Sequence, residues 1–213
     1  MTTREEYRHF LNDSFNGLRL RKPLFYSWDF GLSFDLQVGS TDTDEYFKEV
    51  SRRASTIFET AFAKLDKVFF VFMDYKYKRR KIRLGNFSFK QIDNLNSAEI
   101  SYTKEKGLYE PDGDFDVAII KLTADRMNYK NILTAIGNSD FATRQPRLDQ
   151  NGVFTAKEVY FINIDKKLIF HMYDDRGLDI IATDKETIRP IYKKHNDWIL
   201  DYDREQIDKQ FDK

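Results

Sequence analysis

The stretch of sequence that decides the fold covers residues 159–182 and reads VYFINIDKKLIFHMYDDRGLDIIA. Its first two parts are apolar runs at residues 159–164 and 168–173, which the polar pair Asp165-Lys166 separates. Two short apolar runs around a polar turn are typical of a β-hairpin. We therefore predict two antiparallel strands here.

The acidic segment Asp174-Asp175-Arg176-Gly177 follows directly and has the composition of a tight turn. We expect Gly177 to supply a positive φ there, because glycine adopts that conformation without steric cost. Residues 178–182 are again apolar and form a third strand. The last third of the chain is thus predicted to be a three-stranded meander.

Upstream of the meander, the longest helical pattern covers residues 43–65. Apolar side chains recur on one face from Phe47 to Leu65, while Lys48 points away from that face. The following strand, residues 67–75, is apolar on both faces, which indicates a central strand covered on both sides.

Weaker patterns complete the prediction. We expect helices at 3–11, 129–136 and 204–211, a capping box at 183–186, and strands at 32–38, 100–104 and 115–122. The last helix is expected to start at the cap Asp203, with Tyr202 and Ile207 in contact across its first turn. Together these elements predict a single α+β domain over residues 1–213. Its sheet is mainly antiparallel or mixed, and the helix 43–65 and the C-terminal helices pack on it.

The composition restricts the function. Lys and Arg together number 35, as do Asp and Glu, so no global charge attracts the protein to nucleic acid or to a membrane. The absence of cysteine excludes disulfides, thiolate catalysis and cysteine-ligated metals. The N-terminus lacks the apolar core of a signal peptide. We expect a soluble, cytoplasmic protein without a cofactor, and no nucleotide-binding, zinc-protease or hydrolase motif is present.

One cluster of charge stands out, in a segment expected to be a strand. It contains Lys76, Lys78, Arg79, Arg80, Lys81 and Arg83, with tyrosines interleaved. This mixture can bind phosphates and stack on bases, or dock on an acidic protein surface. It can also be a charged edge strand, because charged side chains at the edge of a sheet prevent pairing with another molecule. In a strand, alternate residues face opposite sides, so only half of the charge would lie on either face. The sequence leaves these three readings open.

The acidic turn is the second candidate site. Asp174, Asp175 and Arg176 follow His171 closely, and two carboxylates with an imidazole can bind a metal ion or share a proton. The same residues are also those that a tight turn requires, with Arg176 paired to Asp174 or Asp179. His171 lies in an apolar run, where a core histidine is the simpler reading.

The C-terminal segment holds a possible interface. Trp198 and Tyr202 are residue types that often anchor protein–protein contacts. The alternative is that Trp198, with its two apolar neighbours, fastens the last helix to the sheet.

Five segments resemble a bacterial domain-of-unknown-function family, number 3885. They are PLFYxWxFG at 23–31, DYKYKRRKIR at 74–83, VYFINI at 159–164, YDDRG at 173–177 and NDWILDYDR at 196–204. The resemblance extends over nearly the whole chain but implies no activity, cofactor or catalytic residue. Small, neutral, cysteine-free bacterial proteins often act as immunity or antitoxin partners, which is an analogy only.

We therefore expect a non-enzymatic binding protein, in particular an immunity- or antitoxin-like inhibitor of a partner protein such as a cognate toxin. The first alternative is a metal-dependent phosphoesterase or nuclease that uses Asp174, Asp175 and His171. The second is nucleic-acid binding through residues 76–83.

Overall fold

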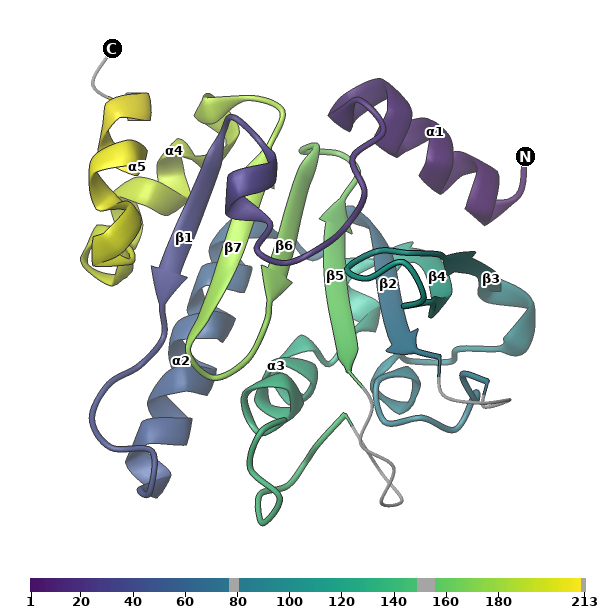
Figure 1. Ribbon diagram of the computed structural model, residues 1–213, viewed down its shortest axis with the longest axis horizontal. Helices are drawn as coiled ribbons and strands as arrows, with labels where there is room; N and C mark the ends of the chain where they lie inside the picture. Colours follow the sequence, from purple (N-terminus) through teal and green to yellow (C-terminus); the bar gives the residue numbers. More distant parts are fainter. Residues whose placement is uncertain (77–80, 149–155, 212–213) are drawn as a thin grey trace.

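The strands form one antiparallel sheet (Figure 1). The computed structural model describes residues 1–76, 81–148 and 156–211, and within these ranges the strand order is β1-β7-β6-β5-β2-β4-β3. The strands are β1 Gly31–Asp35, β2 Lys67–Tyr75, β3 Ile100–Glu105, β4 Phe115–Thr123, β5 Lys157–Asn163, β6 Leu168–Met172 and β7 Gly177–Ala182. Each strand is antiparallel to its neighbours. The predicted α+β class with a mainly antiparallel sheet is confirmed.

The predicted meander is present, because β5, β6 and β7 are adjacent in the sheet. The prediction of a positive φ at Gly177 is wrong, since the described glycines with positive φ are Gly17, Gly39 and Gly107. Gly177 is instead required by close packing. A Cβ atom at this position would lie 2.3 Å from the Tyr173 hydroxyl oxygen and 2.6 Å from the Phe34 carbonyl oxygen.

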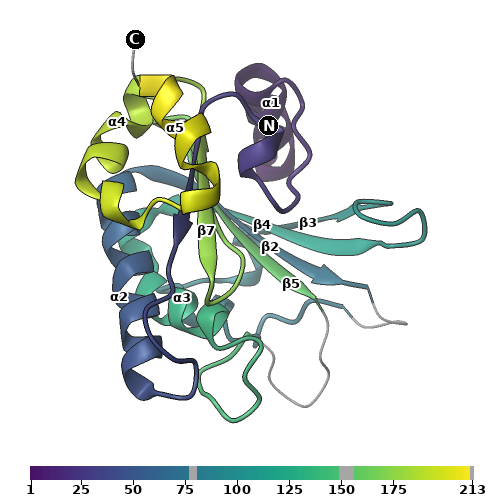
Figure 2. The same ribbon diagram turned by 60° about the vertical axis from the view of Figure 1, so that its left-hand side comes forward.

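Helices cover the two faces of the sheet unequally (Figure 2). The described α-helices are α1 Thr3–Phe15, α2 Asp44–Ala61, α3 Tyr129–Gly137, α4 Lys185–Lys194 and α5 Arg204–Phe211. Helices α2 to α5 pack their apolar residues on what we call the first face, whose central side chains are Phe70, Phe161 and Phe170. Helix α1 packs on the second face, with Phe69 and Ile169. Across the described ranges, no helix combines the length and the apolarity needed to cross a lipid bilayer.

A segment without regular strand structure completes the cover of the second face. Residues 18–28, which we call the strap, cross β5, β6 and β7 on their way from α1 to β1 (Figure 1). The Asp179 carboxylate holds the strap, because it accepts hydrogen bonds from the backbone N–H groups of Leu24 at 2.8 Å and Phe25 at 3.1 Å. At the end of the strap, the Trp28 indole N–H donates to the Ala182 carbonyl at 2.8 Å.

Helix α2 begins where the sequence predicts but ends four residues early. Thr43 caps it, since the Thr43 hydroxyl accepts the Tyr46 N–H at 3.2 Å. Phe62 already has extended dihedral angles (φ −120°, ψ 128°), and the Asp66 carboxylate accepts the Ala63 N–H at 2.8 Å. The sequence places Leu65 on the buried stripe of this helix, whereas its side chain is 76% exposed. That part of the prediction is wrong because a turn replaces the last helical turn.

The C-terminal segment covers the edge of β1. Ile199 forms a bridge with Phe34, and the Leu200 N–H donates to the Ser33 carbonyl at 2.9 Å. The expected contact between Tyr202 and Ile207 does not form, since Tyr202 is 86% exposed while Ile207 is buried.

Two aspartates of this region differ from their expected roles. The cap of α4 is Asp184, whose carboxylate accepts the Glu186 N–H at 2.9 Å, and not the predicted capping box that starts at Thr183. Asp203 is buried, and its carboxylate accepts the Tyr26 hydroxyl at 2.6 Å. This contact ties the start of α5 to the strap.

Candidate functional site

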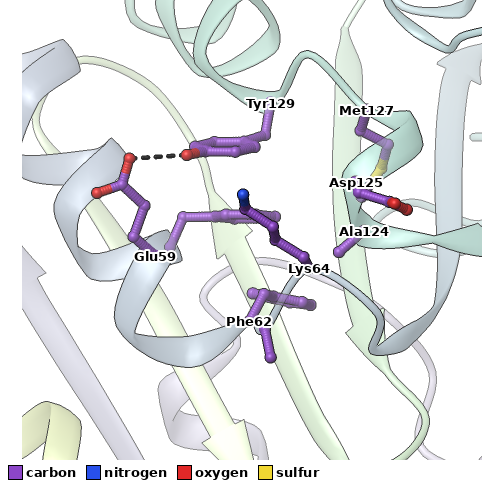
Figure 3. Close-up of a pocket in the computed structure, with 9 residues that line it drawn as sticks. Glu59, Phe62, Lys64, Ala124, Asp125, Met127 and Tyr129 are labelled. Atoms are coloured by element: carbon purple, nitrogen blue, oxygen red, sulfur yellow. Dashed lines mark hydrogen bonds between the residues drawn. The ribbon is translucent and has the colours of Figure 1, made fainter.

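The early end of α2 creates one wall of an open pocket with a volume of about 700 Å³ (Figure 3). Phe58, Glu59 and residues 62–64 form this wall, and the opposite wall consists of Ala124, Asp125, Met127 and Tyr129, which follow β4. Two backbone hydrogen bonds join the walls, from Ala124 N to Asp66 O (3.0 Å) and from Asp125 N to Lys64 O (2.9 Å). The volume is in the range of pockets that bind organic groups.

A stack of three aromatic rings dominates the pocket. The Phe58 ring lies between the rings of Phe62 and Tyr129, with centroid distances of 4.2 Å and 4.4 Å and nearly parallel planes. Phe161 and Phe170 of the sheet contact the Phe58 ring edge-on at 5.1 Å and 5.5 Å. The stack is therefore held by the core on one side while it lines the pocket on the other, which makes it a rigid apolar surface.

Charged groups surround this surface. The Glu59 carboxylate accepts the Tyr129 hydroxyl at 2.7 Å and lies 3.0 Å from the Lys130 ammonium. These two partners, the hydroxyl first, lower the pKa of Glu59. Burial, followed by the bond to Glu59, raises the pKa of Tyr129 to about 12. Glu59 is thus ionised and Tyr129 neutral near neutral pH, which fixes their hydrogen bond.

Sequence reasoning missed this pocket. It placed Phe58, Phe62 and Leu65 on one buried helical stripe, which gives no sign of an opening. The available signal was Asp66, a residue type that favours turns because its carboxylate can accept a nearby backbone N–H, as it does here from Ala63 at 2.8 Å. The second wall comes from a segment about 60 residues further along the chain, so no local pattern could place it there.

The acidic turn has the structural role that the sequence offered as an alternative to chemistry. Asp174 accepts hydrogen bonds from the Arg176 backbone N–H at 2.8 Å and from its guanidinium Nε at 3.0 Å, with a further contact to Nη2. The Asp175 carboxylate accepts the Tyr46 hydroxyl at 2.5 Å. Burial, and then the nearby charges of Asp174 and Asp140, raise the pKa of Asp175.

A metal ion could be held at this turn by a different set of residues from the predicted one. Within the described ranges, the group whose ligand atoms all lie within 4.8 Å of one another is Asp140, Asp174 and Asp175. Carboxylate oxygens suit Mg²⁺ or Ca²⁺. The prediction that His171 joins the two aspartates is not met. Asp140, from the segment after α3, takes that place instead.

His171 lies in the second face, under the strap, and is 1% exposed. Its Nδ1 is 3.0 Å from the Val159 carbonyl oxygen, which can only accept, so Nδ1 carries the proton. The ring stacks on Tyr160 at 4.1 Å, and Nε2 has no hydrogen-bond partner among the described residues. Burial lowers the pKa of His171 and keeps the ring neutral. His171 is a core histidine.

Half of the basic cluster, namely Lys78, Arg79 and Arg80, lies outside the described residues. Strand β2 ends at Tyr75, and the described members Lys76, Lys81 and Arg83 belong to no strand, so for them the predicted basic strand is wrong. The Lys76 ammonium lies 3.9 Å from the Asp114 carboxylate.

Comparison with known proteins found matches that cover most of the chain. The family model described as "Domain of unknown function (DUF3885)" matches residues 7–203. The chain belongs to the DUF3885 family. Similar to it is the "Uncharacterized protein YnaE" of Bacillus subtilis (strain 168), which is 26% identical over 209 residues and covers 91% of this chain and 96% of the relative. No solved structure matches the chain.

The DUF3885 match includes every residue of the pocket, the three carboxylates and the C-terminal candidates. Of the C-terminal candidates, Trp198 is half-buried. Its ring stacks on the His195 ring with a centroid distance of 4.9 Å, and the guanidinium groups of Arg52 and Arg53 lie 5.0 Å and 5.2 Å from its centroid. Tyr202 is exposed.

Proposed function

We propose that the protein is a non-enzymatic binding protein whose partner is another protein, and that the pocket beside α2 is part of its binding surface. The observation that carries this proposal is an open apolar pocket with a polar rim, next to an exposed leucine. Leu65 follows the lining residue Lys64 directly and is 76% exposed. Protein interfaces have this composition, with an apolar centre inside a charged rim.

The state of the candidate catalytic groups supports the same proposal. Asp174 is bonded to Arg176, Asp175 to Tyr46, and His171 lies buried under the strap. A catalytic acid or base must reach the proton that it transfers, directly or through one water. These side chains instead hold a turn and a sheet together.

In its specific form, the proposal is an immunity- or antitoxin-like inhibitor that covers the active site of a toxin. An exposed apolar anchor between charged residues suits such a role, because charge steers the encounter and apolar contact retains the partner. The gene immediately upstream tests this form. A large secreted toxin encoded there supports inhibition, whereas a metabolic operon without a toxin counts against it.

Binding itself is tested by affinity purification from the native host with two matched variants. Leu65→Glu places a charge beside the pocket, and Val38→Glu places one on another exposed apolar residue, before the N-terminal end of α2. We expect a stoichiometric partner with the wild type and with Val38→Glu, and its loss with Leu65→Glu. Thermal unfolding checks that both variants fold. Recovery of no stoichiometric partner, or equal recovery with Leu65→Glu, contradicts the proposal.

The three carboxylates at the acidic turn favour one second candidate, a metal-dependent phosphoesterase or nuclease. It predicts a rise in Tm with Mg²⁺, Mn²⁺ or Ca²⁺, because an ion that binds the folded state stabilises it. Because Arg176 and Tyr46 already bond Asp174 and Asp175, we expect no rise. A rise that Asp175→Asn abolishes and the exposed control Asp197→Asn retains would favour the enzyme.

A further inference from the structure

Lysines gather where α2 ends, beside the pocket. Lys130 pairs with Glu59 at 3.0 Å, Lys166 pairs with Asp66 at 3.0 Å, and Lys194 donates to the Thr60 hydroxyl at 3.2 Å. The C-terminal end of a helix carries partial negative charge, so lysines are favourable there. Each of these three has a partner that explains its position.

Lys64 differs from these three lysines. It lines the pocket, and its ammonium group has no hydrogen-bond or ion-pair partner among the residues that the structure describes. In Figure 3 its ammonium end points toward Tyr129. A cation beside an apolar surface is positioned to pair with an anion that arrives together with an apolar group.

The acidic groups at the pocket do not compete for Lys64. Glu59 is already engaged with Tyr129 and Lys130. Asp125 accepts the Thr123 hydroxyl at 2.5 Å, and its carboxylate points away from the aromatic rings in Figure 3. Asp125 keeps its negative charge, because a neutral hydroxyl does not cancel it, but the charged group that points toward the rings is Lys64.

We propose that the partner segment that fills this pocket carries an aspartate or glutamate next to an apolar side chain. The apolar side chain packs between the ring edges and Met127, and the carboxylate pairs with Lys64. This inference rests on the proposed function, since it names the chemistry of the partner at the same pocket. It commits to a peptide segment because the pocket is open and the exposed apolar residue Leu65 directly follows its lining residue Lys64, which offers a second apolar contact to an extended partner.

The test uses three capped dipeptides as probes: acetyl-Phe-Glu-amide, acetyl-Phe-Gln-amide and acetyl-Phe-Lys-amide. The reporter is the methyl NMR signal of Met127, which lies in the pocket wall and is assigned by its loss in Met127→Leu. We expect the Glu peptide to bind about two- to fivefold more tightly than the Gln peptide, as for a partly exposed ion pair. The Lys peptide should bind most weakly. High salt should reduce these differences.

Two variants localise the charge. Lys64→Met keeps the length of the side chain and removes its charge, so the preference for Glu should disappear. Lys48→Met removes an exposed lysine of α2, away from the pocket, which pairs with Glu45, and should leave the preference unchanged.

Each other outcome has its own meaning. Equal binding of the three peptides, or tightest binding of the Lys peptide, overturns the acidic partner while binding at the pocket stands. If no peptide moves the Met127 signal, the pocket does not accept an apolar side chain, and the proposed function fails as well.

Discussion

The two faces of the sheet are both covered, but by different chemistry. On the first face, β2, β5 and β6 present phenylalanines, and helices cover them. On the second face, a row of polar residues runs across β1, β7, β6 and β5, and each member is the register partner of the next. Its members are Ser33, Asp179, His171 and Tyr160, none more than 3% exposed. The strap covers this row.

The two faces therefore stabilise the fold in different ways. Apolar burial on the first face stabilises the fold without regard to pH. A buried polar group without a partner costs free energy, and Asp179 of the polar row obtains its partners from the backbone of the strap. Asp179 therefore fixes where the strap lies, and its protonation makes stability depend on pH.

The largest effect is expected on the first face. Phe170 is fully buried and contacts Phe58, Phe62 and Phe161. Phe170→Ala should lower the free energy of unfolding by about 3–5 kcal/mol, at every pH where the protein folds. Urea unfolding measures this change. Tyr202→Ala, at an exposed position, should change it by no more than about 0.5 kcal/mol, and a similar loss in both variants would contradict the assignment.

The second-largest effect on stability is expected from Asp179, in the polar row. Burial above all raises the pKa of Asp179 from 3.8 to about 6. Between these values the folded state binds more protons than the unfolded state, so stability falls as pH rises through this window. The full contribution is up to about 3 kcal/mol. Relative to the wild type, Asp179→Asn should therefore gain stability as pH rises from about 4 to about 7.

Urea unfolding of both proteins at several pH values measures this difference. The pH-independent control is Phe170→Ala, whose difference from the wild type should stay constant. A constant difference for Asp179→Asn as well would show that Asp179 titrates normally in the folded state. The strap would then need another explanation for its position.

A third substitution, Gly177→Ala, tests how closely the turn before β7 packs against its neighbours. Gly177→Ala places a methyl group against the Tyr173 hydroxyl and the Phe34 carbonyl, and should cost about 1–3 kcal/mol. Gly85 has nothing within 4 Å of its added Cβ, so Gly85→Ala serves as the control and should be nearly neutral. Thermal unfolding compares the two. If removing the Tyr173 hydroxyl in Tyr173→Phe rescues none of the loss, the Phe34 carbonyl alone makes the clash.

Gly177 also shows what the sequence could and could not predict. Its place in a turn between two strands follows from local composition, and the meander was predicted correctly for this reason. The reason for a glycine does not follow, because Phe34 approaches from a strand more than 140 residues away. Local patterns specify elements, whereas the contacts between distant elements depend on the whole fold.

The candidate site shows the same limit. The apolar stripe of residues 43–65 predicted a helix with the correct start, but it extended the helix past Ala61, where Lys166 and Asn163 bond the last carbonyl group. These partners come from the β5–β6 hairpin, about 100 residues later. The acidic turn was predicted as a turn, while the contact of Asp175 with Tyr46 could not be seen from the sequence. The pocket and the acidic turn therefore both depend on contacts between residues that lie far apart in the sequence.

The smallest effect comes from a buried histidine on the helical side, and it has the opposite sign to that of Asp179. His195 is buried beneath Trp198, and burial, followed by the charges of Lys194 and Arg52, lowers its pKa from 6.5 to about 4. In this window the unfolded state binds more protons, so stability is lost as pH falls. We expect about 1–2 kcal/mol, less than for Asp179, because the imidazole lies near the surface where solvent screens its charge.

The variant His195→Gln tests this effect. The Thr60 hydroxyl, 2.9 Å from Nε2, already donates to the Thr56 carbonyl, so the imidazole must donate to Thr60, and a glutamine amide can do the same. Relative to the wild type, the variant should gain stability as pH falls from about 6.5 to about 4, the direction opposite to Asp179→Asn. Urea unfolding of the two variants over one pH series checks the signs together. If both variants differ from the wild type with the same slope, the opposition between the polar row and the helical side is wrong.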